Sequence, residues 1–174
     1  MGQLARISSG TVWEPIVGYS RAVRYGDFVA VSGTTATDAH GTIVGGGQMY
    51  VQARQALTNI RSALERMGLT IGNVVRTRMF VTDIDRFAEA ARAHREFFAD
   101  SPPATTMVEV RRLADPRMLI EIEADAYAPE AARTAPVAPA KVSALEPKAI
   151  AKKPAAASSK SAKRPAPKKT KRRR

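Results

Sequence analysis

The sequence predicts an α+β domain in which two amphipathic helices pack on one face of a mixed β-sheet. Three observations indicate this fold. Two stretches repeat apolar residues at helical spacing, several short runs have the pattern of strands, and a neutral body ends where the composition changes near Pro129. The elements follow in the order β-β-α-β-α-β-β. The sheet face without helices must be covered by a partner, or the sheet must curl against a neighbour.

A hairpin opens the predicted sheet. Residues 28–33 are a short, largely apolar run that follows the turn signal at residues 25–27, and a run of this length suits a buried strand. Residues 22–24 precede the turn and are the expected hairpin partner. Residues 38–47 contain four glycines and are predicted to form a loop.

The two helices are predicted from apolar residues at spacings of three and four. The first runs over about 48–67, and Gly68 follows it as a C-cap. The second starts at Asp83 or Asp85, either of which can act as an N-cap, and it ends at the prolines of residues 101–103.

Three further strands complete the sheet. Residues 74–82 alternate apolar with polar side chains and are rich in β-branched residues, which predicts a strand with one buried face. Residues 105–110 and 118–126 are the last two strands. Because side chains alternate along a strand, Glu121, Glu123 and Asp125 are expected to share one face.

The charge of the chain is divided sharply between two segments. Residues 1–129 carry 14 arginines, no lysine and 14 acidic residues, so this body is neutral. Residues 130–174 carry 14 basic residues and two glutamates, which accounts for the whole net charge of +12. The sequence therefore predicts one folded domain over 1–129 and a separate basic tail over 130–174.

Composition also excludes several kinds of chemistry. The chain has no cysteine, which rules out disulfides, thiolate catalysis and cysteine-based zinc sites. It has only two histidines, His40 and His94, so we expect no metal site. No stretch approaches the length of a membrane span, and we expect a cytoplasmic protein without a membrane partner.

The tail has the composition of a disordered polycation. Ala, Pro, Lys and Ser dominate, and so few large apolar residues cannot offset the entropy of ordering. Such a chain neutralises phosphates without reading bases, since it has no aromatic residue for stacking. The alternative is a solvated extension that binds any acidic surface. The candidate nucleic-acid-binding residues are Lys152, Lys153, Lys163, Arg164, Lys168, Lys169, Lys171, Arg172, Arg173 and Arg174; binding by them would make the protein nucleoid-associated.

Six short strings follow one another in the body: residues 18–23 (GYSRAV), 26–33 (GDFVAVSG), 52–60 (QARQALTNI), 97–98 (FF), 103–110 (PATTMVEV) and 121–124 (EIEA). In this order and spacing they resemble the RidA (YjgF) family of enamine and imine deaminases. The resemblance implies a chorismate-mutase-like homotrimer whose sheets line a central barrel, with clefts between subunits. It also implies hydrolysis of short-lived enamines and imines to 2-keto acids and ammonia, without a cofactor.

The resemblance assigns roles to several residues of this chain. Glu121 takes the place of the water-orienting glutamate, and we expect it to be catalytic. Tyr19 and the backbone of Ser32 and Gly33 are retained as substrate-binding groups. Thr105, however, stands where the family has an arginine that binds the substrate carboxylate, so the chain resembles a subfamily without this signature. The cleft asparagine of the family is also absent, because Ala91 takes its place.

Each of these candidates has a simpler structural interpretation. Glu121 is equally one exposed acid of three on a strand face. Thr105 and Thr106 are candidates for binding a neutral or phosphate-like ligand, but β-branched residues in a strand need no ligand to explain them. Tyr19 is equally well explained by packing near the hairpin. Arg78 or Arg112 is a candidate to replace the missing arginine. His94 lies on the apolar side of its helix, where a packed histidine is favoured over a catalytic base.

Two functions from different classes follow from the sequence. In the first, the protein is a Rid-type deaminase or metabolite binder with altered specificity, and its activity on 2-imino acids is weak. In the second, the domain is a trimeric platform that presents basic tails to nucleic acid. The two are compatible, and deletion of residues 130–174 separates them.

Overall fold

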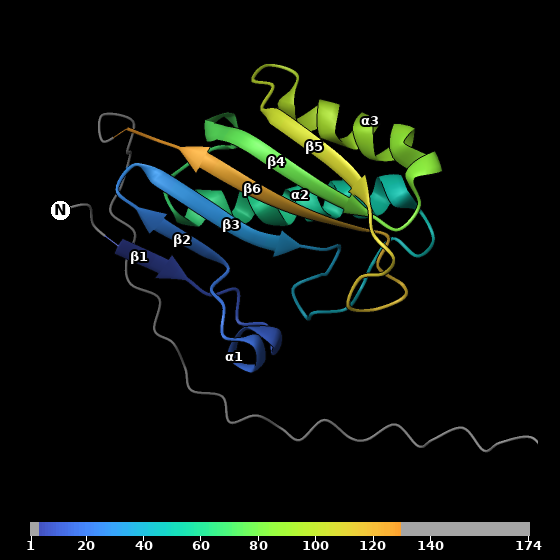
Figure 1. The fold of residues 1–174 in the computed structure, drawn as a ribbon. Coiled ribbons are helices and arrows are strands. Elements are labelled where there is room, and N and C mark those ends of the chain that lie inside the picture. The colour runs from blue at the N-terminus through green and yellow to red at the C-terminus, as the bar shows by residue number, and fades with distance from the viewer. Residues whose placement is uncertain (1–3, 130–174) are drawn as a thin grey trace, which may run out of the picture.

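The computed structural model describes residues 4–129 (Figure 1). The predicted disordered tail and its nucleic-acid-binding lysines and arginines lie outside the described residues. Within 4–129, no helix has the length and apolar character needed to cross a membrane.

Six strands form one sheet in the order β1-β2-β3-β6-β4-β5. Their bounds are Leu4–Ile7 for β1, Ala22–Tyr25 for β2, Phe28–Thr34 for β3, Val74–Val81 for β4, Ala104–Glu109 for β5 and Ile120–Tyr127 for β6. Strands β4 and β5 are parallel, and every other neighbouring pair is antiparallel. The α+β fold with a mixed sheet is therefore confirmed.

Two long helices cover one face of this sheet (Figure 1). They are α2 (Met49–Arg66) and α3 (Phe87–Phe98), and α2 packs on α3, β3 and β6. The core lies between the layers, where Leu57, Ile60 and Leu64 of α2 and Ile120 and Ile122 of β6 are fully buried. Short 3-10 turns precede β4 (η1, Ile71–Asn73) and α3 (η2, Ile84–Arg86). Asp83 caps the second of these turns by accepting a hydrogen bond from the Asp85 amide.

The structure adds two elements to the predicted order. Strand β1 pairs with β2, and a short helix, α1 (Trp13–Val17), follows it. The predicted order of seven elements lacked both, because four residues give too short an alternation and five residues show no helical period. Gly18 ends α1 in the left-handed conformation, with φ of 82°.

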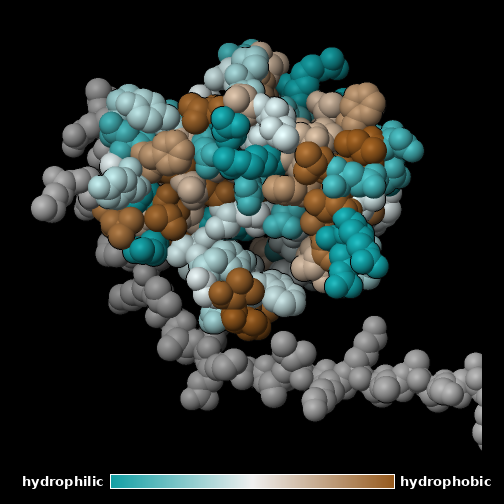
Figure 2. All heavy atoms as spheres, in the orientation of Figure 1, coloured by the Kyte–Doolittle hydropathy of each residue, from teal (hydrophilic) through white to brown (hydrophobic). Residues whose placement is uncertain are grey.

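The other face of the sheet carries no helix in the described residues. The predicted alternation of β6 is confirmed, since its even-numbered residues 120–126 are buried and Glu121, Glu123 and Asp125 lie on the opposite face. This open face also exposes a row of large apolar side chains that are cross-strand neighbours: Leu4, Tyr25, Phe28 and Tyr127. Figure 2 shows brown and tan side chains on both sides of a teal patch.

Candidate functional site

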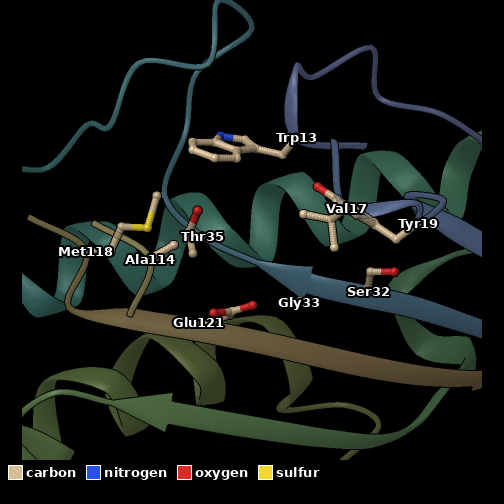
Figure 3. A pocket seen from close by; sticks show the side chains of 9 residues that line it. All are labelled: Trp13, Val17, Tyr19, Ser32, Gly33, Thr35, Ala114, Met118 and Glu121. Carbon is tan, nitrogen blue, oxygen red and sulfur yellow. The ribbon is translucent and has the colours of Figure 1, made fainter. Parts of the chain in front are cut away.

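A pocket of about 340 Å³ opens beside the end of β3 (Figure 3). It draws on five segments: Trp13 and Val17 of α1, Tyr19 after that helix, Ser32, Gly33 and Thr35 around the end of β3, Ala114 and Met118 from the loop before β6, and Glu121 of β6. Four of the predicted site residues, Tyr19, Ser32, Gly33 and Glu121, are therefore brought together. This volume lies at the small end of the range for ligand sites in proteins.

An irregularity in the sheet places Glu121 in this pocket. The pairing of β3 with β6 shifts register between Val31 and Thr34, so that Ser32 and Gly33 bulge where regular pairing stops. Glu121 then lies directly over Gly33. A Cβ at residue 33 would overlap the Glu121 Oε1 and lie 2.9 Å from its Cδ. Only glycine leaves room for the carboxylate in this position.

The surroundings of Glu121 disfavour its charged form. Burial raises the pKa of this carboxyl group above its ordinary value, and the neighbouring Glu123 raises it further, while Arg21 acts in the opposite direction. A carboxyl group whose pKa is shifted toward neutrality can accept and return a proton during a reaction. The position of Glu121 therefore suits general acid–base chemistry.

The Arg21 side chain forms hydrogen bonds to the backbone of the bulge. One of its nitrogens, Nη2, donates to the carbonyl oxygens of Ser32 at 2.6 Å and Gly33 at 2.7 Å. The Ser32 hydroxyl in turn donates to the Ser20 carbonyl at 2.7 Å. Burial lowers the pKa of Arg21, and its guanidinium lies 5.9 Å from the Tyr19 ring centre. Arg21 therefore supports the backbone that faces Glu121.

The two threonines predicted as ligand contacts lie elsewhere. Thr105 and Thr106 are exposed on β5, which is separated from β3 by two strands. The Thr105 hydroxyl lies 2.9 Å from the Thr77 hydroxyl, and that oxygen lies 2.9 Å from Nε2 of His94. The structure thus divides the predicted site residues into a pocket group and a β5 group within one chain.

His94 fits the expectation of a packed and hydrogen-bonded histidine. Its ring lies 4.5 Å from that of Phe98, and its Nε2 bonds the buried Thr77. Burial lowers the pKa of His94, which favours the neutral imidazole.

Neither arginine considered as a substitute for the missing signature residue lines the pocket. Arg78 lies on the open face, where its Nη1 is 3.5 Å from Glu123 and 3.2 Å from Asp125. Arg112 belongs to the loop between β5 and β6 and is exposed. Within the described chain, the pocket therefore receives no cation from either residue.

Sequence reasoning missed several wall residues. Trp13 is one of them, and the structure places it in the pocket wall. Val17, Thr35, Ala114 and Met118 carried no signal, because small and apolar residues in irregular segments resemble ordinary packing. Arg21 lies inside the string 18–23, but only the structure shows that its side chain donates hydrogen bonds to the carbonyl oxygens of the bulge.

The described residues define a small α+β protein with a pocket beside a bulged strand and with one sheet face that they leave without a helix. A family model described as Endoribonuclease L-PSP matches residues 11–128. Curated proteins named as members of the RutC family also match, including one from Pyrococcus horikoshii at 36% identity, over 66% of this chain and 90% of that protein. The chain belongs to the RidA/YjgF family.

Other relatives cover the same region. The 2-iminobutanoate/2-iminopropanoate deaminase of Salmonella typhimurium is 36% identical over 109 residues, which is 61% of this chain and 84% of that protein. The crystal structure of a YjgF/YER057c/UK114 family member from Mycobacterium tuberculosis has a TM-score of 0.66 and 46% identity, and covers 72% of this chain and 99% of that one. The E. coli YjgF gene product has a TM-score of 0.59 and 31% identity, with 71% and 92% covered.

Proposed function

We propose that this protein is a cofactor-free imine or enamine deaminase whose specificity differs from that of its arginine-bearing relatives. The observation that supports this most strongly is the Glu121 carboxyl group, held over Gly33 in a pocket with Tyr19. The deaminase name of the Salmonella relative supports the same chemistry.

The reaction needs only water and a proton-transferring group. Glu121 in its charged form accepts a proton from water as the water oxygen attacks the imine carbon. The electron pair of the C=N bond moves to nitrogen, which takes a proton. Cleavage of the C–N bond then releases ammonia and leaves a carbonyl compound. An enamine enters the same route after protonation at carbon gives the imine.

The absence of an arginine at residue 105 predicts weak activity on 2-imino acids. A bidentate arginine binds carboxylate through two charge-assisted bonds, and replacing it with a threonine removes about 2–4 kcal/mol of binding. That corresponds to roughly one and a half to three decades of rate. We expect hydrolysis of 2-aminoacrylate to lie far below that of the Salmonella deaminase.

Three variants test this proposal in one assay of 2-aminoacrylate hydrolysis. Thr105→Arg should raise the rate, and Glu121→Ala should abolish it. Thr106→Arg adds the same charge to the adjacent residue of β5, whose side chain projects to the other face, and should not raise the rate. Wild-type turnover equal to that of the Salmonella enzyme would show that another group binds the carboxylate.

We also propose that the active form is a homotrimer in which the pocket becomes a cleft between subunits. The exposed row of Leu4, Tyr25, Phe28 and Tyr127 on the uncovered sheet face supports association, because such an apolar surface is costly in water. In the trimer, β5 of a neighbour supplies the second wall with Thr105. Light scattering on the full chain should return three times the subunit mass, and a monomer at micromolar concentration would contradict this.

A second proposed function belongs to the basic tail. The confinement of the +12 charge to residues 130–174 favours sequence-independent binding to nucleic acid. Three tails on one trimer would add avidity. Binding to duplex DNA should fall with salt, with a log–log slope of about −0.9 per phosphate neutralised. Loss of residues 130–174 should abolish binding, and retained affinity would place the interface on the folded domain.

A further inference from the structure

The pocket has the charge pattern of a cation-binding site. Among its lining residues within the described chain, Glu121 is the only one with a charged side chain. Trp13, Val17 and Met118 give the walls a large apolar area. Figure 3 shows Trp13 and Glu121 on opposite sides of the cavity. A ligand between them meets an aromatic face on one side and a carboxyl group on the other.

A negatively charged ligand is disfavoured in this setting. Glu123 already repels the ionised form of Glu121, and a substrate carboxylate would place a further anion beside them. The charge of Arg21 offsets part of this repulsion, but its side chain does not line the pocket and its Nη2 donates to the carbonyl oxygens of Ser32 and Gly33, so it is not placed to bind a ligand carboxylate in the cavity.

A flat cation is favoured for the same reasons. Its charge would stabilise ionised Glu121, which is otherwise partly desolvated. The rings of Trp13 and Tyr19 attract cations through their faces, and Trp is the strongest of the aromatic residues in this respect. The apolar walls would take an alkyl or aryl group of the ligand.

We infer that the pocket selects protonated imines whose carbon bears an apolar alkyl or aryl group and no carboxylate. This inference rests on the proposed deaminase function and names its substrate class. The balanced reaction consumes one iminium ion and one water molecule, and it yields one aldehyde or ketone and one ammonium ion. Water adds to the carbon and gives one proton to Glu121, that proton passes to nitrogen, and the C–N bond breaks as ammonia departs and the carbonyl forms. The second proton of the water, released from the new hydroxyl group as the carbonyl forms, is taken up by the departing ammonia.

Binding of three stable analogues tests the selectivity for charge. Benzamidinium, benzamide and benzoate share one ring and nearly one shape, and they carry charges of +1, 0 and −1. Calorimetry on the full-length protein at pH 7.5 should show benzamidinium binding about tenfold or more tightly than benzamide, and benzoate more weakly than both. A tenfold ratio corresponds to about 1.4 kcal/mol.

A matched variant identifies the group responsible. Glu121→Gln keeps the shape of the side chain and removes its charge, so the preference for benzamidinium should disappear while benzamide binding is retained. Glu65→Gln, on the exposed side of α2, removes an equal charge away from the pocket and should leave the order unchanged. Benzoate binding as tightly as benzamidinium, or a preference that survives Glu121→Gln, would overturn the inference.

Hydrolysis then separates the ligand class from the proposed reaction. A flavin amine oxidase acting on benzylamine supplies the imine of benzaldehyde, and an amino acid oxidase acting on alanine supplies 2-iminopropanoate. We expect the protein to accelerate ammonia release from the imine of benzaldehyde more than from 2-iminopropanoate. The predicted binding order without acceleration of either reaction would refute the deaminase function alone. Faster hydrolysis of 2-iminopropanoate with tight benzoate binding would refute the ligand class alone.

Discussion

The substitution Gly33→Ala tests whether the close approach of Glu121 to the bulge is needed for function. The backbone of Gly33 is not in the left-handed region, so alanine is compatible with its conformation. The added Cβ would nevertheless overlap Glu121 Oε1 and lie 2.9 Å from Cδ, closer than real Cβ contacts allow. The carboxyl group must therefore rotate away, while the backbone stays in place.

The expected effects on function and stability differ in size. A catalytic group displaced by about 1 Å loses on the order of 10²-fold in rate, and general acid–base catalysis contributes roughly 10²–10⁴-fold. We therefore expect about a 10²-fold loss of imine hydrolysis. Stability should change by less than about 1 kcal/mol, because alanine also restricts the unfolded chain and the Glu121 side chain is flexible.

Two measurements test whether Gly33→Ala acts through the Glu121 carboxyl group. NMR titration should find the pKa of Glu121 above its ordinary value in the wild type and lower in Gly33→Ala, where the group moves toward solvent. In a Glu121→Gln background, Gly33→Ala should cost no further activity, because the chemistry is already lost. Gly47→Ala is the matched control, since a Cβ there meets no atom within 4 Å.

The result that would refute this reasoning is specific. If Gly33→Ala lowered activity equally with and without the Glu121 carboxylate, the bulge would act through the backbone and not through Glu121. Full activity in Gly33→Ala would show that the close approach is incidental.

Three further predictions concern stability. Arg21→Met removes the Arg21 donor from the carbonyls of Ser32 and Gly33 and leaves the Ser32 carbonyl with the Thr34 hydroxyl, so it should destabilise the fold by about 1–3 kcal/mol in urea unfolding. Burial raises the pKa of Glu14, but hydrogen bonds from Ser8 and Ser9 outweigh this effect and hold the pKa below its ordinary value of 4.5. The contribution of Glu14 to stability is therefore present above pH 4.5 and is lost as the pH falls through the folded-state pKa. Glu14→Gln should flatten the acid end of the stability profile. Burial lowers the pKa of His94 below 6.5, so wild-type stability should fall as pH drops from 6.5 through that value, and His94→Gln should remove this slope.

Regular periodicity made much of the fold predictable. The helical repeat gave α2 within one residue at each end, and the alternation of β6 placed Glu121 and Glu123 together on the face away from the core. These features depend on spacing within a single element, which the sequence displays directly. The short α1 was not predictable in this way, although it supplies Trp13 to the pocket.

The details of the site depend on contacts between elements. The position of Gly33 under Glu121 follows from a register shift between β3 and β6, and nothing in either strand specifies that shift alone. In the sequence, Arg21 is only a charged residue just before a predicted strand, and its role emerges where the bulge presents two carbonyl oxygens to it. The separation of Thr105 from the pocket likewise needed the strand order, because β5 follows α3 in sequence but pairs with β4 at the far edge.

The bulge, Arg21 and Glu121 together explain why this pocket suits a cation. Arg21 is the cation whose charge lowers the pKa of Glu121. Its Nη2, however, donates to the carbonyl oxygens of Ser32 and Gly33 at the bulge, and its side chain does not line the cavity. A half-buried carboxylate without a cation beside it in the cavity is costly, and a bound iminium would remove that cost where the reaction takes place. An arginine at residue 105 would favour carboxylate ligands, whereas Thr105 adds no charge. The same carboxyl group would then determine both which imines bind and how their hydrolysis begins.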